Sequence, residues 1–210
     1  SVDHQFYEAF NRDNVELVDI REHPIVEFTA SGIRTEAGEY PLDMIIFATG
    51  FDVFTGSILA PTIVGRGGVT LKEKWGDGPA NYLGLSTAGF PNLFIMVGPG
   101  SPSLLSNVLV STEEHADFIR DLIADMNARD LNEVEARRDA EQEWVQHVNE
   151  RSQETLYPKA RSYYMGDEVP GKPHVFMPYS GGVRGYRRIL HQVMANQWEG
   201  FNMRKVGGSS

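Results

Sequence analysis

Two apolar runs of strand length stand out in the hydrophobic pattern of the chain. Residues 93–97 are apolar at every position and lead into Gly98-Pro99-Gly100, and residues 44–47 are likewise apolar and lead into Ala48-Thr49-Gly50. Strands that are apolar on both faces are typical of the interior of a sheet, and glycine and proline end such strands in turns. The pattern therefore predicts an interior strand at each run, followed by a tight loop.

Helical spacing of apolar residues alternates with shorter strand-like segments along the rest of the chain. Apolar residues three and four positions apart predict helices over residues 111–126, within 139–155 and from 186 to just before Gly200. Ser111 and Glu114 have the spacing of a capping box at the start of the first helix. Short strands are predicted at residues 15–20, 25–28, 33–35, 40–42 and 68–71, with a hairpin turn at 36–39 and the end of a helix within 6–13.

These strands are too few and too far apart to close a doubly wound sheet. The nearest glycine motifs, Gly65-Arg66-Gly67-Gly68 and Gly98-Pro99-Gly100, lack the third glycine of a dinucleotide fingerprint, and Ser103 stands where it would be needed after the second of them. We therefore expect the chain to depend on a further segment that completes its sheet.

Composition narrows the class of protein without identifying it. The 210 residues suit one large domain or two small ones, and 41% of them are hydrophobic, enough for a core. The net charge of -10 argues against nucleic acid or an anionic membrane as the main partner. The chain has no cysteine, which fits a reducing compartment, and no apolar run near the roughly 20 residues that span a bilayer. The expectation is a cytoplasmic enzyme.

Several kinds of site are disfavoured by spacing. The chain has no G-x-S-x-G nucleophile elbow. Arg184, Arg187 and Arg188 could bind a phosphate, but a helix start that faces water is the simpler explanation. The histidines show no metal-ligand spacing, so each is expected to be structural or solvated. They are His4, His23, His115, His147, His174 and His191.

Longer stretches carry a resemblance to a known family. They are DMIIFATGFD at 43–52, YLGLSTAGFPNLF at 82–94, GPGSPSLLSN at 98–107, NEVEARRDAEQEWVQHVNERSQETLYPKARSYY at 132–164 and VPGKPHVFMPYSGG at 169–182. In this order, over nearly the whole chain, they resemble the C-terminal part of flavin-dependent Baeyer–Villiger monooxygenases. The family's two G-x-G-x-x-G motifs, its F-x-G-x-x-x-H-x-x-x-W fingerprint and its catalytic arginine and aspartate are not in this chain and lie upstream of it in the family.

The resemblance implies an α/β fold, namely the C-terminal part of a flavoprotein with two dinucleotide-binding domains. Residues 1–47 would end the NADP-binding domain, and residues 48–130 would hold the crossing and the part of the FAD domain with the active-site loop. Residues 131–206 would form a helical, lid-like part of the FAD domain, and 207–210 a flexible tail.

The resemblance also assigns candidate site residues. Those implied for FAD and NADP binding are Ala48, Thr49, Gly50, Phe51, Asp52, Val108 and Tyr163, and those for the ketone are Pro102, Ser103, Leu104, Leu105 and Met177. Simpler structural interpretations compete with these roles. Thr49 and Gly50 also suit an ordinary strand exit, Asp52 an exposed turn, and the two leucines and Met177 plain core. Tyr163 departs from the tryptophan of several family members but keeps a flat ring and a donor.

The implied function is insertion of one oxygen atom of O2 into a ketone, giving an ester or lactone, with FAD and NADPH as cofactors. This chain would be active only with the missing N-terminal part of the same enzyme as its partner. Two alternatives remain open: a related flavin monooxygenase that oxidises nitrogen or sulfur, and a catalytically incomplete module that binds no cofactor. Retention of flavin on purification separates the last from the first two.

Overall fold

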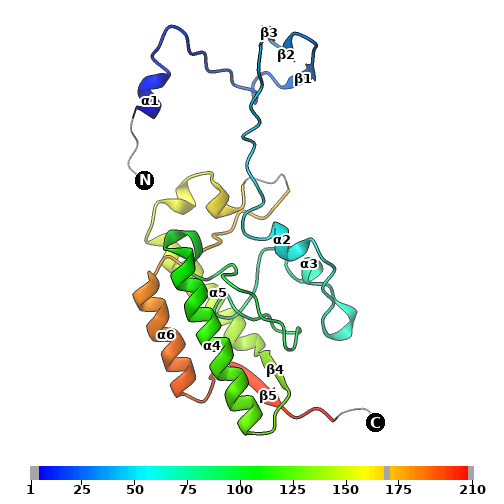
Figure 1. The fold of residues 1–210 in the computed structure, drawn as a ribbon, viewed down its shortest axis with the longest axis vertical. Coiled ribbons are helices and arrows are strands. Elements are labelled where there is room, and N and C mark those ends of the chain that lie inside the picture. The colour runs from blue at the N-terminus through cyan, green and yellow to red at the C-terminus, as the bar shows by residue number, and fades with distance from the viewer. Residues whose placement is uncertain (1–4, 168–170, 208–210) are drawn as a thin grey trace. The chain divides into compact units, whose positions relative to one another are not determined.

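The chain divides into two compact units, residues 1–49 and 50–210 (Figure 1). The computed structural model describes residues 5–167 and 171–207. The expected flexible tail therefore lies, apart from Gly207, outside the described residues. No helix among the described residues is long and apolar enough to cross a membrane.

The first unit contains a short helix and a small antiparallel sheet. Helix α1 (Phe6–Ala9) is followed by β1 (Ile25–Phe28), β2 (Gly32–Thr35) and β3 (Glu39–Pro41), with β2 in the middle. Ile33 on β2 is paired with a residue of β1 on one side and of β3 on the other. The predicted strands at 25–28 and 33–35 and the turn after them are confirmed, and β3 begins one residue earlier than expected.

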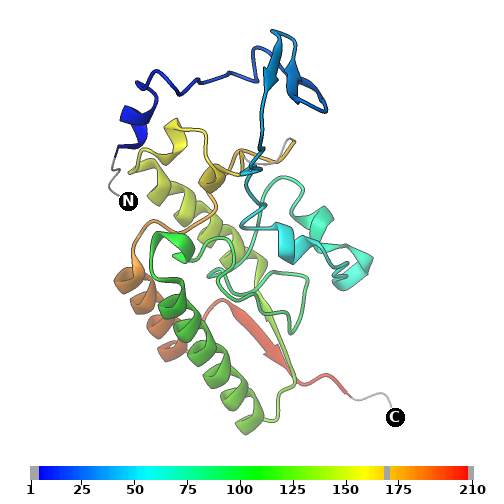
Figure 2. The ribbon, with the colours of Figure 1, turned by 45° about the horizontal axis from the view of Figure 1, so that its top comes forward.

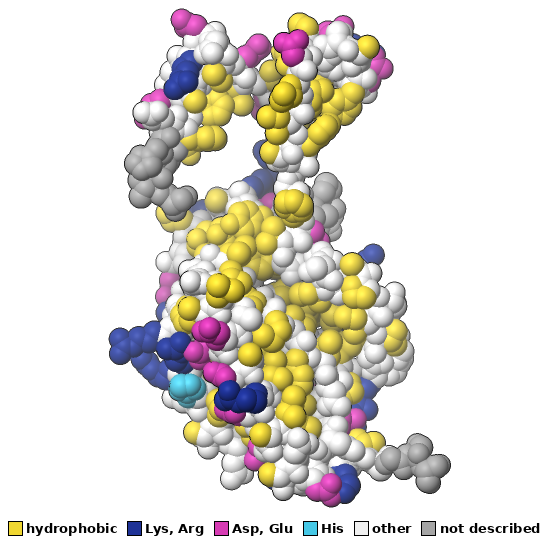
Figure 3. All heavy atoms as spheres, in the orientation of Figure 1, with side chains coloured by type: hydrophobic (Ala, Val, Ile, Leu, Met, Phe, Trp, Pro, Cys, Tyr) yellow, Lys and Arg dark blue, Asp and Glu magenta, His cyan; other side chains and the backbone are white. Residues whose placement is uncertain are grey.

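The apolar run 44–47 does not form a strand. It is irregular, and Ile46 is 81% and Phe47 69% exposed. Residues 15–20 are irregular as well. A strand that is apolar on both faces needs hydrogen-bonded neighbours on both sides, and no described strand of this unit pairs with either segment. Figure 3 shows such hydrophobic side chains in yellow, open to solvent on this unit.

The second unit is built around three helices and a two-stranded sheet. These helices are α4 (Val108–Ala128), α5 (Arg138–Gln153) and α6 (Val183–Ala195), and β4 (Glu133–Ala136) pairs antiparallel with β5 (Phe201–Arg204). Helices α4 and α6 lie side by side in both ribbon views (Figures 1 and 2). All three predicted helices are confirmed, whereas neither β4 nor β5 was expected.

Apolar faces of these elements share one core. Phe118 and Leu122 of α4, Trp144 of α5 and Tyr186 of α6 are buried in it. Phe118 packs edge-on against Trp198, with ring centroids 5.2 Å apart. The helical spacing seen in the sequence therefore corresponds to a packed interior.

Shorter elements complete the second unit. They are α2 (Gly56–Leu59), η1 (Arg66–Gly68), α3 (Leu71–Lys74), η2 (Ser103–Leu105), η3 (Tyr157–Lys159) and η4 (Tyr163–Met165). Leu71 and Trp75 form a smaller core with Phe90 and Ile95. The expected strand at 68–71 is wrong, because Thr70 instead caps α3 through a capping box with Glu73.

The capping box expected at Ser111 and Glu114 is also wrong. Helix α4 begins at Val108, and the Asn107 side chain accepts a hydrogen bond from the Leu109 N–H at 3.0 Å. Ser111 is buried inside the helix. Glu114 pairs with Arg187 of α6 at 2.5 Å, so its carboxylate links two helices instead of capping one, and this arginine faces an acid.

Residues 93–97 do not form an interior strand. The Ile95 N–H donates to the Leu85 carbonyl at 2.8 Å, and the Val97 N–H donates to the His115 ring at 3.0 Å. Val97 has a φ of 53°, which is outside the strand region. A turn and a side chain therefore supply the hydrogen bonds that neighbouring strands would supply in a sheet.

Candidate functional site

The glycine–proline loop, residues 98–107, lies so close to the turn at 81–86 that no side chain fits between them. The Gly98 N–H donates to the Gly84 carbonyl at 3.2 Å. Gly84 has a φ of 68°, and a Cβ there would lie 2.7 Å from the Ser101 Cβ and 2.8 Å from its backbone nitrogen. Asn81 binds both sides, donating to the Pro99 carbonyl at 2.6 Å and accepting from the Gly84 N–H at 2.9 Å. The two backbones form one rigid layer.

The backbone of Met177 joins this loop to the segment around Tyr163. Its N–H donates to the Tyr164 carbonyl at 2.8 Å, and its carbonyl accepts from the Gly100 N–H at 2.6 Å. The Trp144 indole donates to the Gly100 carbonyl at 3.2 Å. The structure thus brings three separately predicted parts of the site together.

The predicted substrate residues differ in exposure. Pro102 and Ser103 are buried, Leu104 is 40% exposed, and Leu105 is half-buried against the main core. Ser103 has a φ of 43°, a strained value for a residue other than glycine. Only Leu104 of this group presents a large part of its side chain to the outside.

Met177 is 1% exposed and lines a cavity of about 320 Å3. Asn81, Gly100 and Trp144 also line this cavity. Its described lining includes neither Leu104 nor Leu105. Met177 and the two leucines therefore do not line this cavity together.

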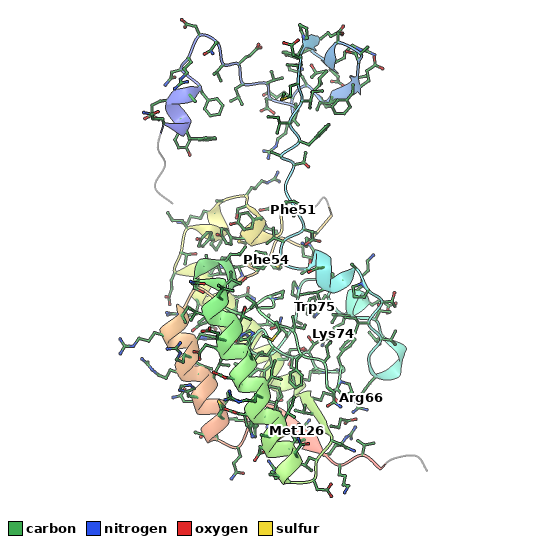
Figure 4. All side chains as sticks on the ribbon, in the orientation of Figure 1. Phe51, Phe54, Arg66, Lys74, Trp75 and Met126 are labelled. Carbon is green, nitrogen blue, oxygen red and sulfur yellow. The ribbon has the colours of Figure 1, made fainter. Side chains whose placement is uncertain are left out.

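A charged and aromatic corner forms where the second unit begins. Asp52 Oδ1 accepts from Lys172 Nζ at 2.6 Å and from the Thr55 hydroxyl at 3.1 Å. Although burial raises the pKa of Asp52, the hydrogen bond and charge of Lys172 together with Thr55 hold it below its usual value. Phe54, which is labelled in Figure 4, stacks on Tyr163 with ring centroids 6.3 Å apart.

The other predicted cofactor residues are the consecutive residues 48–51 and, elsewhere in the chain, Val108. Ala48 and Thr49 close the first unit and are exposed, and Gly50 opens the second. Phe51 is 84% exposed. Val108 is half-buried at the first turn of α4, where backbone N–H groups have no partner inside the helix.

The backbone of Gly50 and two nearby aromatic rings of the second unit are open to other atoms. A Cβ on Gly50 would meet nothing within 4 Å, so other atoms can approach its backbone. The ring of Phe51, the next residue, is exposed, and the exposed ring of Tyr163 stacks on Phe54. The chain has no glycine fingerprint for a diphosphate. This sequence therefore does not contain the usual phosphate cradle of a dinucleotide.

His115 is buried behind the loop and was not singled out by the sequence. Its Nδ1 accepts from the Val97 N–H, and its Nε2 lies 2.6 Å from the Tyr186 hydroxyl. Burial lowers the pKa of His115 to about 4. No group of three or more possible metal ligands occurs among the described residues.

The lowered pKa of His115 predicts a pH dependence of stability. The unfolded chain takes up a proton on this ring as the pH falls through about 6.5, whereas the folded chain does so only near 4. Stability from this group is therefore complete above the unfolded value and is lost as the pH falls toward 4. Between pH 7 and pH 5, the free energy of unfolding should fall by about 2 kcal/mol.

This prediction is checked by denaturant unfolding at both pH values in the parent and in His115→Asn. The difference between the two proteins in the pH dependence of the free energy of unfolding reports the titration of the His115 ring alone. An equal pH dependence in parent and variant would contradict a neutral buried His115.

Comparison with known proteins gives clear relatives, although no family model matches the chain. It is 41% identical over 189 residues to a Baeyer–Villiger monooxygenase of Pseudooceanicola batsensis, covering 90% of this chain and 34% of that protein. It is 41% identical to the phenazine N-monooxygenase PhzNO1 of Lysobacter antibioticus, covering 93% of this chain and 36% of the relative. A solved structure titled OTEMO complex with FAD and NADP superposes with a TM-score of 0.84 at 38% identity, over 95% of this chain and 37% of that one.

The chain belongs to the Baeyer–Villiger monooxygenase family. It spans about a third of the length of the relatives it matches. The expected fold is confirmed: the chain is a C-terminal part of an α/β flavoprotein with two dinucleotide-binding domains. The sequence-based expectation of a particular likeness to phenylacetone monooxygenase is not supported by the relatives named here.

Proposed function

We propose that the protein containing this chain is an FAD- and NADPH-dependent Baeyer–Villiger monooxygenase that inserts one oxygen atom of O2 into a ketone. The observation that carries the proposal is family membership over 90% of the chain, joined to a rigid glycine–proline loop with an exposed leucine at its edge. When bound, FAD reduced by NADPH supplies the activation of oxygen. The chain's own residues would orient the ketone and exclude water.

Each predicted site residue has a proposed task. The backbone at Ala48, Thr49 and Gly50 would allow close approach of a cofactor, and Asp52 would hold the start of the second unit through Lys172 and Thr55. Phe51 and Tyr163 would offer flat rings to a cofactor, and Val108 a free backbone N–H at the start of α4. Pro102 and Ser103 would stiffen the loop, and Leu104, Leu105 and Met177 would shape the ketone site.

The exposure of the two leucines predicts different effects of truncation. Leu104→Ala should change the free energy of unfolding by less than about 1 kcal/mol, because much of the side chain is already in water. It should nevertheless change the ratio of kcat/KM values for a small and a bulky ketone by about tenfold. Leu105→Ala should cost about 2 kcal/mol because it opens a gap at the core. Unchanged ketone preference in Leu104→Ala would exclude that residue from the substrate site.

A second activity, oxygenation of nitrogen, is favoured by one observation. The phenazine N-monooxygenase is as similar to this chain, at 41% identity, as the Baeyer–Villiger relative. Competition between a cyclic ketone and an aromatic N-heterocycle, with products identified by mass spectrometry, separates the two activities. Ester or lactone as the main product supports the first, and N-oxide alone supports the second.

The experiment that tests the proposed function begins with the purified enzyme containing this chain. A flavin absorption band that bleaches with NADPH in the absence of oxygen, and NADPH oxidation that a ketone stimulates, would support it. A colourless protein would instead support a module without cofactor. The proposal has three further parts. Residues 1–47 belong to the NADP-binding domain, and residues 48–130 and 131–206 belong to the FAD domain. The N-terminal part of the enzyme is the partner of this chain, and the enzyme is cytoplasmic.

A further inference from the structure

A chain of three hydrogen bonds connects Val97, the residue before the glycine–proline loop, to α4, α6 and the turn at 81–86. The Val97 N–H lies 3.0 Å from His115 Nδ1, His115 Nε2 lies 2.6 Å from the Tyr186 hydroxyl, and that hydroxyl lies 2.5 Å from the Leu83 carbonyl. His115 and Tyr186 are fully buried. We call this chain the His115 relay.

The ends of the relay determine the direction of every bond in it. An amide N–H can only donate, so His115 Nδ1 accepts from Val97. A carbonyl can only accept, so the Tyr186 O–H points at Leu83 and its oxygen accepts from His115 Nε2–H. His115 is therefore neutral and in one tautomer, consistent with the depressed pKa that burial gives it.

Both ends of the relay hold strained backbone. Val97 has a φ of 53° and Leu83 a φ of 59°, values that branched and bulky residues rarely adopt. Val97 directly precedes the glycine–proline loop, and Leu83 directly precedes Gly84, on which that loop packs. Strain of this kind persists only where surrounding contacts impose it.

We propose that His115 is a positioning residue whose neutral ring sets the conformation of the glycine–proline loop from behind, without touching cofactor or ketone. The inference rests on the proposed function in one respect: the loop must border the reacting groups for its conformation to affect turnover. The structural part of the inference depends only on the relay.

Two substitutions of His115 each keep one of its two hydrogen bonds and remove the other. The amide oxygen of Asn in His115→Asn can stand near the position of Nδ1 and accept from Val97, but Asn is too short to reach Tyr186. The amide nitrogen of Gln in His115→Gln can stand near the position of Nε2 and donate to Tyr186, but it leaves Val97 without an acceptor. His191→Gln on the exposed face of α6 is the matched control.

The test uses the full-length, flavin-loaded enzyme and two independent measurements. Amide hydrogen exchange of the peptide spanning residues 97–103 reports the loop without requiring activity. We expect exchange at least tenfold faster in His115→Gln, and within about twofold of the parent in His115→Asn and His191→Gln. We expect kcat/KM for the ketone to fall about tenfold in His115→Gln alone, while the rate of flavin reduction by NADPH stays unchanged.

The two measurements distinguish the possible failures. Parent-like exchange in His115→Gln, or equally fast exchange in both His115 variants, would overturn the role of the Val97 bond, whatever the activity. Faster exchange with unchanged kcat/KM would overturn the positioning role in turnover and show that the loop does not border the reacting groups. Absence of ketone oxygenation in the parent would contradict the proposed function and leave the exchange result to decide the relay.

Discussion

Replacing Gly84 by alanine should lower the free energy of unfolding by about 3 kcal/mol. A side chain at its φ of 68° is strained by roughly 1–2 kcal/mol, and the added Cβ would lie 2.7 Å from the Ser101 Cβ, an overpacking that costs roughly 1–3 kcal/mol. Denaturant unfolding followed by tryptophan fluorescence measures this loss, because Trp75, Trp144 and Trp198 are all buried in the second unit.

Gly67→Ala is the matched control for this substitution. Gly67 has a φ of 70°, nearly the same as Gly84, but an added Cβ would meet nothing within 4 Å. Gly67→Ala should therefore lower the free energy of unfolding only by the backbone strain at this φ, about 1 kcal/mol. Equal losses in the two variants would contradict the close packing of the glycine–proline loop on the 81–86 turn.

Replacing Lys74 by methionine should cost about 2 kcal/mol, because it leaves a buried carboxylate without its cation. Glu141 is 3% exposed and binds Lys74 Nζ at 2.7 Å and the Ala88 N–H at 2.8 Å. Lys74 is partly exposed and the Ala88 bond remains, so the loss is smaller than for a pair sealed from water. Lys74 is labelled on α3 in Figure 4.

Arg151→Met is the control for the loss of an ion pair. Arg151 binds Glu154 at 2.9 Å on the exposed side of α5, where such pairs contribute about 0.5 kcal/mol or less. The double variant Lys74→Met with Glu141→Leu lacks the buried charge. If its free energy of unfolding returns toward that of the parent, the unpaired carboxylate causes the loss. A loss no greater than that of Arg151→Met would contradict it.

Segments with local causes were predictable from the sequence. Helix α4 buries Phe118, Leu122 and Met126 at helical spacing, as expected. The hairpin of β2 and β3 follows from two short strand-like segments on either side of the turn at 36–39. Each element contains within itself the apolar face or turn that determines it.

Segments whose partners lie elsewhere were not predictable in the same way. Residues 44–47 and 93–97 have the composition of interior strands, but a strand requires neighbours, and the described residues supply none for them. Asn107 and not Ser111 caps α4, because the helix starts at Val108, before the residues 111–126 over which a helix was predicted. The chain spans only about a third of its relatives' length, which agrees with strand-like segments that have no neighbouring strand.

Site residues taken from the resemblance were located by the structure but not tested by it. Met177 is bonded to the loop at Gly100 and to Tyr164, the neighbour of Tyr163, whereas Leu104 does not line the cavity that Met177 lines. The sequence did not reveal His115, because a histidine at an inward position of an amphipathic helix resembles any core residue. Its position on the buried face at the spacing of Phe118 and Leu122 was the one available signal.

The most direct test of the central claim is the fate of labelled oxygen. The full-length enzyme containing this chain is incubated with NADPH, a cyclic ketone and 18O2, and the products are examined by mass spectrometry. The account predicts a lactone that carries one 18O atom. Oxidation of NADPH without any labelled ester or lactone, across cyclic, linear and aromatic ketones, would contradict it.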